Sequence, residues 1–280
     1  MNGRYWDGWR ERAAVPATRV ATALLGEIPR LRSILDTRHP PSTMLDPLGV
    51  VVNETPGLAT PGASQSSGGV RRVWLRKDDD VRRRRFTLCH ELGHLLLRDA
   101  GQEEALSVAS VERLCDEFGS LLLIDRQALA LQLADGFDWA PVSVLALCRV
   151  WKSSLTPMIL ALERATGANG RVVLIASKRV NPRTGVDPGY RVDAAAGGSL
   201  FLPRNQRLSS LGLTELASWC EDRAGGKRGD GCDKTAQIVV LRRKEGEGAF
   251  LCGPVRWAAA RLVHGVLAVL DVSAMMQPMK

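Results

Sequence analysis

Two histidines and a glutamate stand at the spacing of a metal-dependent hydrolase, in the segment His90-Glu91-Leu92-Gly93-His94. Histidines four positions apart on a helix project from the same face, so both imidazoles can reach one ion. The glutamate between them can accept a proton from a metal-bound water. The pentapeptide alone is only suggestive, because so short a motif also arises by chance in about one chain of this size in a hundred.

A zinc site of this kind needs a third protein ligand and one position left open for water. Glu112 lies beyond His94 on the next predicted helix, and Asp116 follows it by one helical turn. The spacing predicts Glu112 as the third ligand and Asp116 as the carboxylate that orients a ligand histidine. The alternative is a solvated helix face, which is the usual place for helical carboxylates. The leucine-rich surroundings of both residues favour the metal site.

These two segments closely resemble the signatures of the ImmA/IrrE-type metallopeptidases. Residues 84–97 read RRFTLCHELGHLLL, which resembles the core R-F-T-x-x-H-E-x-G-H-x-L-L. Residues 111–123 read VERLCDEFGSLLL, which is similar to E-x-x-A-N-x-F-A-A-x-L-L-M-P. In the resemblance the zinc ligands are His90, His94 and Glu112, the general base is Glu91, and Asp116 stands where the family has Asn or Asp.

The chain departs from the family pattern at three places. Cys115 replaces an alanine, Gly119-Ser120 replaces Ala-Ala, and Asp125 occupies the place of a proline. None of these changes removes a ligand or the base, so they concern packing and helix termination. The resemblance is specific over about residues 40–165, and in the C-terminal part it is limited to the general pattern of the sequence.

The resemblance implies a zincin-like metallopeptidase domain, a helix-turn-helix-like segment near Pro141–Ala165, and a C-terminal regulatory domain that is GAF-like in the radiation-response branch. Family members cleave a helix-turn-helix transcriptional repressor and so switch on stress, DNA-damage or mobile-element genes. The residues by themselves lead only to metal-assisted hydrolysis. The repressor as partner and substrate is implied by the resemblance.

The expected mechanism uses zinc to lower the pKa of a bound water, with Glu91 as the group that takes the proton and passes it to the leaving amine. A substrate strand is expected to pair with the strand at residues 70–75, so Trp74→Pro should cripple turnover and leave zinc content intact. Tyr190 and His264 are remote candidates for stabilising an oxyanion, and a structural role is favoured for each.

A second class of function stays open. In it the chain is a transcriptional regulator or sensor whose zinc fold is structural and whose segment 141–165 binds DNA or a partner. Glu91 favours the peptidase, because a purely structural site needs no base. Segment 141–165 carries only three positive charges, which is few for a DNA-reading element. Two histidines and a carboxylate also suit iron or manganese, although the helical spacing favours zinc.

Hydrophobic periodicity and turn residues predict the elements that position the site. They are a helix over 17–35 interrupted at Pro29, a strand over 49–52, a long flexible loop over 53–69, a second strand over 70–75 at a sheet edge, and helices from Phe86, over 110–123 with Ser110 as N-cap, over 141–150 and over 156–165 with Thr156 as N-cap.

After residue 170 the pattern favours strands. They are expected over 171–176, 190–192, 199–202, 237–241 and 249–252, with a helix near 213–220, a loop over 224–234 and a last helix over 257–272. The fold class is therefore α+β, with a metallopeptidase domain over 1–135, a helix-turn-helix-like segment over 136–168 and a smaller mixed α/β domain, GAF-like by the resemblance, over 169–280.

Composition excludes several classes of protein. Of 280 residues, 45% are hydrophobic and 24% charged, which excludes a disordered or collagen-like chain. No apolar run reaches the length of a membrane span, and the N-terminus lacks a secretory layout, so we expect a cytoplasmic protein without a membrane partner. Six well-separated cysteines without a C-x-x-C pair predict free thiols in a reducing compartment.

The net charge of +8 is concentrated in one place. Eight basic and three acidic residues lie between Arg71 and Arg85, so five of the eight net charges fall there. Such a patch can bind a phosphate backbone, but it lacks interleaved aromatic residues or a base-reading motif. Direct DNA binding is therefore weakly supported, and the run Arg82–Arg85 is expected to be a solvated lead-in to the helix.

Overall fold

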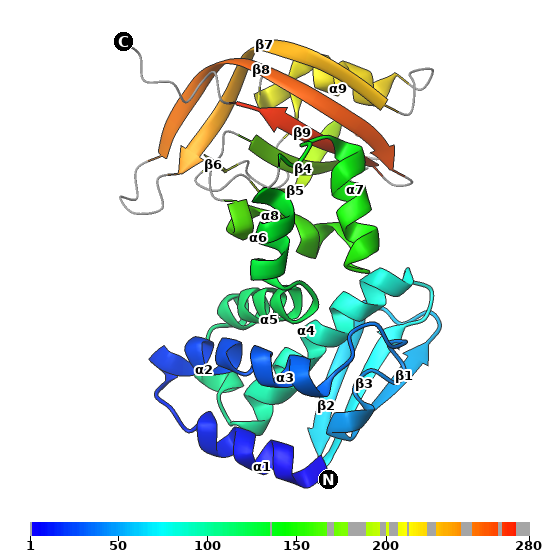
Figure 1. Cartoon of the computed structure of the whole chain (residues 1–280), viewed down its shortest axis with the longest axis vertical. Helices are drawn as coiled ribbons and strands as arrows, with labels where there is room; N and C mark the ends of the chain where they lie inside the picture. Colours follow the sequence, from blue (N-terminus) through cyan, green and yellow to red (C-terminus); the bar gives the residue numbers. More distant parts are fainter. Residues whose placement is uncertain are drawn as a thin grey trace. The chain divides into compact units, whose positions relative to one another are not determined.

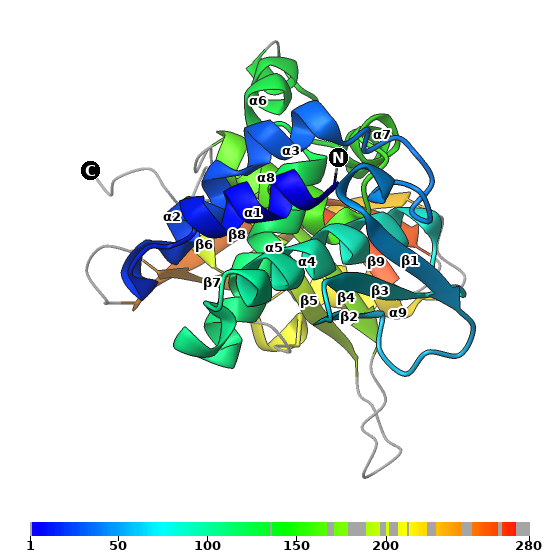
Figure 2. The same cartoon turned by 90° about the horizontal axis from the view of Figure 1, so that it is seen from below.

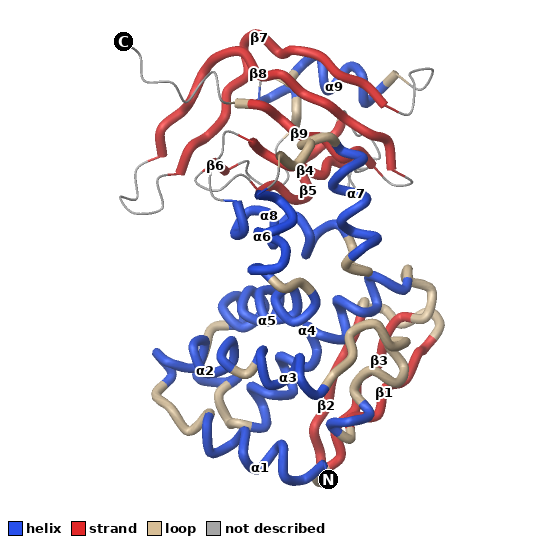
Figure 3. The backbone as a smooth tube through the Cα atoms, viewed as in Figure 1, coloured by secondary structure: helices blue, strands red, loops and turns tan. Residues whose placement is uncertain are grey.

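The computed structural model describes residues 2–134, 136–166, 171–178, 189–196, 200–201, 207–211, 213–222, 228–241, 248–262 and 265–272. These residues form a mixed α+β structure with two sheets, which confirms the α+β class predicted from the sequence (Figures 1 and 3). It divides into two compact units. The first consists of Met1–Asp125 with Cys148–Met158, and the second of Arg126–Leu147 with Ile159–Lys280.

Three helices open the first unit: α1 (Asn2–Arg12), α2 (Val20–Gly26) and α3 (Ile28–Ile34). The helix predicted over 17–35 is thus interrupted, as expected. The break between α2 and α3 is at Glu27, and Pro29 lies in the first turn of α3. A proline fits there because the first turn needs no N–H donor. The apolar residues at helical spacing face the core, and Leu24 and Leu31 are fully buried.

Helix α1, which the sequence did not predict, is held by two buried tryptophans. The indole N–H of Trp6 donates to the carbonyl of Leu48 and that of Trp9 to the carbonyl of Leu96, both at 2.8 Å. A buried indole contributes a large apolar area and still needs a partner for its N–H. These two bonds fix α1 to the unit that carries the histidines.

A three-stranded sheet of order β1-β3-β2 completes the first unit. Its strands are β1 (Val50–Thr55), β2 (Gly62–Ser67) and β3 (Val70–Arg76). Strand β3 pairs parallel with β1 and antiparallel with β2, so it is central and the prediction of an edge strand over 70–75 is wrong. Its arginines misled the prediction: Arg72 reaches solvent from the outer face, and buried Arg71 pairs with Asp99.

The flexible loop predicted over 53–69 is also wrong in part, because it contains β2 and the end of β1. The residues of β2 alternate between half-buried and exposed positions, but the half-buried ones are Gly62, Ser64 and Ser66. Small polar residues on the inner face give no apolar alternation, which is the signal that identifies a strand in a sequence.

Helices α4 (Val81–Asp99) and α5 (Val108–Leu123) lie side by side, and α4 packs against β2 and β3 (Figure 2). Helix α4 begins before Phe86, with Asp80 as its N-cap, and α5 has Ser107 as N-cap where Ser110 was predicted. The Ser107 side chain accepts the N–H of Ser110, which satisfies one of the free donors of the first turn.

Two glycines let α4 and α5 approach closely. A Cβ built at Gly93 would lie 3.1 Å from Cys115 Sγ, and one at Gly119 would lie 3.1 Å from the backbone N of His90. Both separations are tighter than ordinary contacts to a Cβ. The departure from the family pattern at Gly119 therefore belongs to the packing of α5 against the His90 backbone.

The arginine run at the start of α4 is engaged within the protein. Arg84 Nη1 lies 2.5 Å from a Glu54 carboxylate oxygen. Arg85 is buried and donates to the backbone carbonyls of Arg38 and His39. The prediction of a solvated lead-in is wrong for these two residues, because their guanidinium groups join α4 to neighbouring segments.

Three further helices follow: α6 (Arg126–Ala134), α7 (Pro141–Val150) and α8 (Leu155–Thr166). Helices α7 and α8 were predicted, although α8 begins at Leu155 and so includes the expected N-cap Thr156. No single helix among the described residues is long and apolar enough to cross a membrane; α7 and Leu155–Leu162, bent by 106°, pass that test only as a pair.

The second unit contains an antiparallel sheet of order β5-β4-β9-β8-β7-β6. Its strands are β4 (Arg171–Lys178), β5 (Tyr190–Ala196), β6 (Leu200–Phe201), β7 (Arg228–Leu241), β8 (Gly248–Leu262) and β9 (Gly265–Asp271). Helix α9 (Thr214–Glu221) was predicted and contributes Leu216 and Cys220 to the core of the sheet. The strand predicted over 199–202 is described only at 200–201.

The last predicted helix, over 257–272, is wrong, since most of this stretch belongs to β8 and β9. In β8 the buried Val255, Trp257 and Ala259 alternate with exposed Arg256, while 266–270 is buried throughout. A continuous apolar run reads the same in a buried strand as in a buried helix. The predicted loop over 224–234 is likewise wrong from Arg228 on, because β7 pairs there with β8.

Four cysteines are free and buried: Cys89, Cys115, Cys148 and Cys220. The side chains of Cys232 and Cys252 lie outside the described residues. Burial raises the pKa of the Cys89 and Cys115 thiols above its usual range. Thiols held protonated in this way are weak nucleophiles, which favours a packing role for the two cysteines beside the histidines.

Candidate metal centre

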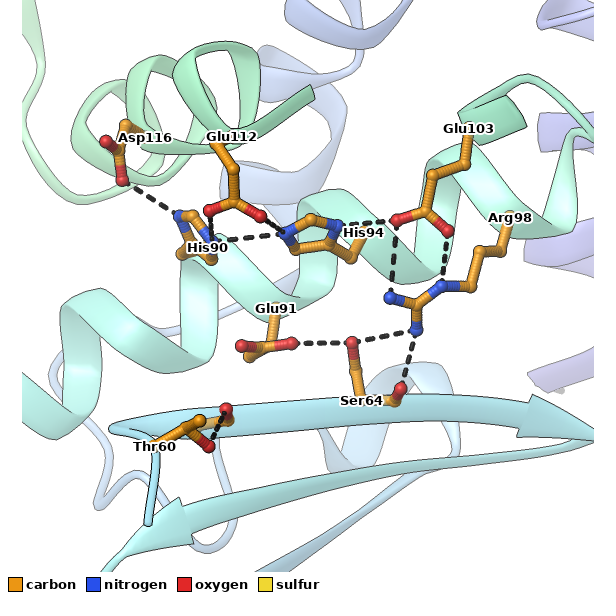
Figure 4. A network of polar contacts seen from close by, with 10 residues as sticks. Thr60, Ser64, His90, Glu91, His94, Arg98, Glu103, Glu112 and Asp116 are labelled. Carbon is orange, nitrogen blue, oxygen red and sulfur yellow. Dashed lines mark hydrogen bonds and ion pairs between the residues drawn. The ribbon is translucent and has the colours of Figure 1, made fainter. Parts of the chain in front are cut away.

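Three ligand atoms converge where α5 crosses the middle of α4 (Figure 4). The Nε2 atoms of His90 and His94 lie 3.1 Å apart. Glu112 places one carboxylate oxygen 3.5 Å from His90 Nε2 and the other 3.4 Å from His94 Nε2. A tetrahedral zinc ion with bonds of about 2.1 Å separates its ligand atoms by about 3.4 Å. The donors therefore fit one zinc ion in type and in spacing.

Each histidine has a carboxylate behind it. His90 Nδ1 lies 2.9 Å from Asp116 Oδ1, and His94 Nδ1 lies 2.6 Å from Glu103 Oε1. A carboxylate can only accept, so each Nδ1 carries a proton and Nε2 is the nitrogen of each histidine that faces the metal position. The structure thus places Asp116 where the sequence predicted it and adds Glu103, which the sequence motifs did not indicate.

A turn after α4 brings Glu103 back to the site. Gly101 has φ +63° and ends the helix, and the N–H of Gln102 donates to the carbonyl of Leu97 at 2.9 Å. This left-handed turn is one that glycine adopts readily at the end of a helix. Gly101 therefore marked the end of the helix in the sequence but did not indicate which of the following carboxylates reaches His94.

The environment of His90 favours its protonated form in the metal-free protein. Burial lowers the pKa of His90, but the hydrogen bond and charge of Asp116, with the charges of Glu91 and Glu112, outweigh it, so the pKa is raised. The same carboxylates would favour a divalent cation at this place. Protons and metal therefore compete for the same imidazole.

Glu91 is buried and held from the side of β2. The hydroxyl of Ser64 donates to Glu91 Oε2 at 2.6 Å. Gly62 lies directly against it, since a Cβ at Gly62 would sit 3.2 Å from Glu91 Oε1 and 2.4 Å from Thr87 Cγ2. The predicted base Glu91 is thus held by the Ser64 hydroxyl, and the space that it occupies is open because Gly62 has no side chain. No motif in the sequence pointed to either residue.

A cleft of about 560 Å³ opens over the three ligand atoms and Glu91. One wall is the chain from Thr60 to Gly62 and the other includes Ser154 and Thr156, with α4 and α5 between them. All these residues belong to the first unit. A cleft of this size can hold part of a peptide, and the predicted base and ligands line it.

The free edge of the sheet beside the cleft is β2. The N–H of Arg76 donates to the carbonyl of Pro61, so the alternation of an antiparallel ladder leaves the N–H and C=O groups of Gly62 and Ser64 pointing away from β3. Central β3 has no free edge, so the prediction that a substrate pairs along 70–75 is wrong. Trp74→Pro would break the sheet instead of testing substrate binding.

Two residues, Tyr190 and His264, were predicted as remote candidates for stabilising an oxyanion. Tyr190 packs against the core of the second unit, consistent with a structural role, and His264 lies outside the described residues. The structure brings together the five residues predicted from spacing, while their roles in binding and chemistry stay predictions. They are His90, Glu91, His94, Glu112 and Asp116.

Residues 45–156 match the family model of the IrrE N-terminal-like domain, which is a peptidase family. The match spans all five site residues and confirms, over these residues, the resemblance to the ImmA/IrrE family seen in the sequence. No curated protein matches the chain. Among solved structures, a Mycobacterium tuberculosis transcriptional regulator aligns over 99% of this chain and 97% of its own, at 10% identity and a TM-score of 0.47, a likeness that supports no inference.

Proposed function

We propose that the first unit is a zinc-dependent endopeptidase. The observation that carries this proposal is the joint placement of three zinc-type donors and a buried, separately held carboxylate in one cleft beside a free strand edge. The family match supports a metallopeptidase-like or regulatory role. A structural zinc site would need no Glu91 aimed into a cleft, so the geometry favours catalysis over a purely structural metal.

The residues divide the work in a way that follows from their positions. Zinc, when bound, lowers the pKa of a water and polarises a carbonyl oxygen. His90, His94 and Glu112 hold the ion, with Asp116 and Glu103 fixing the imidazoles. Glu91 accepts the proton of the attacking water and gives it to the leaving amine.

The outward N–H groups of Gly62 and Ser64 offer hydrogen-bond donors to an extended peptide backbone beside Glu91. A substrate that pairs there must present an extended segment. We propose as substrate a helix-turn-helix transcriptional repressor, whose cleavage would derepress stress, DNA-damage or mobile-element genes. The second unit would then be a regulatory domain of GAF-like type. The family resemblance motivates both statements.

Metal content and cleavage together test the proposal. Purified wild-type protein is expected to hold one zinc per chain, Glu112→Ala to lose it, and Glu91→Gln to keep it. Cleavage is measured by mass spectrometry on a random peptide library and on helix-turn-helix repressors encoded near the gene. Wild type should cleave and Glu91→Gln should not.

The outcomes separate the two classes of function. Zinc retained in Glu112→Ala would mean a different third ligand. Full zinc content without cleavage of any repressor or peptide would favour the regulator with a structural metal. Cleavage that persists in Glu91→Gln would refute the role of this carboxylate.

A further inference from the structure

We propose that Arg98 is a positioning residue that joins the two halves of the site, the histidine ligands and the base. The inference rests on the proposed function and deepens it. Arg98 lies one turn beyond His94 on α4, so residues 90, 94 and 98 follow one another along the same face. Its guanidinium contacts both the carboxylate behind His94 and the strand that holds Glu91.

The contacts of Arg98 to Glu103 use two of its nitrogens. Nε donates to Glu103 Oε2 at 2.5 Å, and Nη2 lies 3.3 Å from Oε1, the oxygen that accepts from His94 Nδ1. Such a planar fork fixes the orientation of a carboxylate more strictly than a point charge can. Arg98 thereby sets the direction from which Glu103 holds the His94 imidazole.

The third nitrogen of Arg98 reaches β2. Nη1 donates to the backbone carbonyl of Ser64 at 2.6 Å and lies 3.1 Å from Ser64 Oγ, which in turn donates to Glu91 Oε2 (Figure 4). With Nη1 beside its oxygen, the Ser64 hydroxyl directs its proton at Glu91. One side chain therefore fixes a ligand through Glu103 and the base through Ser64.

A merely structural arginine would not need this arrangement. Arg98 and Glu103 are both partly exposed, so their charge pair adds little to the free energy of unfolding. The Arg98 guanidinium instead fixes geometry, since it keeps Glu103, which contacts His94, and Ser64, which contacts Glu91, at a fixed separation. Loss of Arg98 should thus weaken metal binding and turnover more than stability.

Metal affinity tests the first half without any substrate. Zinc affinity is measured by competition with a chromophoric chelator for wild type, Glu103→Gln, Arg98→Gln and the double variant. We expect Glu103→Gln and Arg98→Gln each to bind zinc about 10- to 100-fold more weakly, the usual cost of losing an outer partner of a ligand. Because Arg98 acts through Glu103, the double variant should bind no more weakly than Glu103→Gln alone.

Ser64→Ala separates the two branches. It removes the hydroxyl that contacts Glu91 but keeps the backbone carbonyl that holds Arg98. Its zinc affinity should stay within about twofold of wild type, while its kcat should fall with KM little changed. Arg82→Gln is the matched control, because Arg82 is an arginine of the same helix whose guanidinium pairs with the N-cap Asp80.

Three results would overturn the proposal: wild-type zinc affinity in folded Arg98→Gln, losses in the double variant that multiply, or an equal loss in Arg82→Gln. Should Arg98→Gln fail to fold, Arg98→Lys keeps the charge without the fork, and wild-type zinc affinity there would overturn it. The affinity readout does not depend on cleavage, so an inactive protein with these affinities would contradict the peptidase and leave the coupling standing.

Discussion

Replacing Gly62 with alanine tests whether the backbone of β2 holds Glu91 in place. The added Cβ would lie 2.4 Å from Thr87 Cγ2 and 3.2 Å from Cγ and Oε1 of Glu91. Two carbon atoms reach their best separation at about 3.5–4.0 Å, so the overlap with Thr87 is about 1 Å. Thr87 is buried on α4, one turn before Glu91. Relief of that overlap therefore requires β2 and α4 to separate or Thr87 to rotate, and the contacts at 3.2 Å press on Glu91 directly.

The size of the effect follows from that overlap. Adding a methyl group to a packed interior costs about 1–3 kcal/mol, which lowers the melting temperature by about 2–4 °C per kcal/mol in a protein of this size. A displacement of about 1 Å at a catalytic group can lower turnover about 100-fold. No atom of a metal ligand lies among the three nearest contacts, so zinc content should stay at one per chain.

The assay compares kcat/KM, zinc content and melting temperature of Gly62→Ala with those of Gly26→Ala. At Gly26 no atom lies within 4 Å of the position that a Cβ would take, and this exposed residue ends α2, so alanine there should change none of the three quantities. A Gly62→Ala protein with a lowered melting temperature but wild-type kcat/KM would refute the reasoning, because the overlap would then be relieved without moving the base.

Three more predictions concern single contacts. In metal-free protein the raised pKa of His90 contributes stability that is fully present below about pH 6.5 and is lost as pH rises through the folded-state pKa. Asp116→Asn should therefore lower the melting temperature more at about pH 6 than at about pH 8.5. An equal drop at both pH values would contradict this. Trp9→Ala should lower the free energy of unfolding by about 3–5 kcal/mol in a urea titration, whereas a loss below about 1 kcal/mol would mean that α1 is not anchored. Gln65→Pro, which removes a ladder N–H, should destabilise the protein by about 1–3 kcal/mol, and Ser66→Pro at the free edge should not; equal melting temperatures would show that the ladder register is wrong.

Local spacing in the sequence accounts for the predicted part of the site. His90 and His94 lie one turn apart on one helix, and Glu112 and Asp116 one turn apart on another, so helix geometry alone places each pair on one face. Contacts between distant segments carry no such period. Ser64 and Glu91 are 27 positions apart in the sequence, and no pattern in β2 predicts the hydrogen bond between them.

The fold was predictable where one face of an element is apolar and the other polar. Helices α5 and α7 met that condition, and their ranges agree with the sequence to within two residues. Strand β9 did not, because 266–270 is buried throughout and reads as a helix as easily as a strand. The central place of β3 depends on β2, whose small polar residues gave no signal.

The open edge of β2 also bears on self-association. A strand with unpaired N–H and C=O groups is a template on which other chains can add and aggregate, and proteins commonly protect such edges with charged or covering side chains. Here the hydroxyl of Thr60 donates to the outward carbonyl of Gly62, and Arg98 donates to that of Ser64. A second copy of the chain would have to displace both side chains to extend the sheet. The two side chains thus cover the outward carbonyls of this edge against edge-to-edge aggregation, while the outward N–H groups of Gly62 and Ser64 remain as donors for a peptide in the cleft.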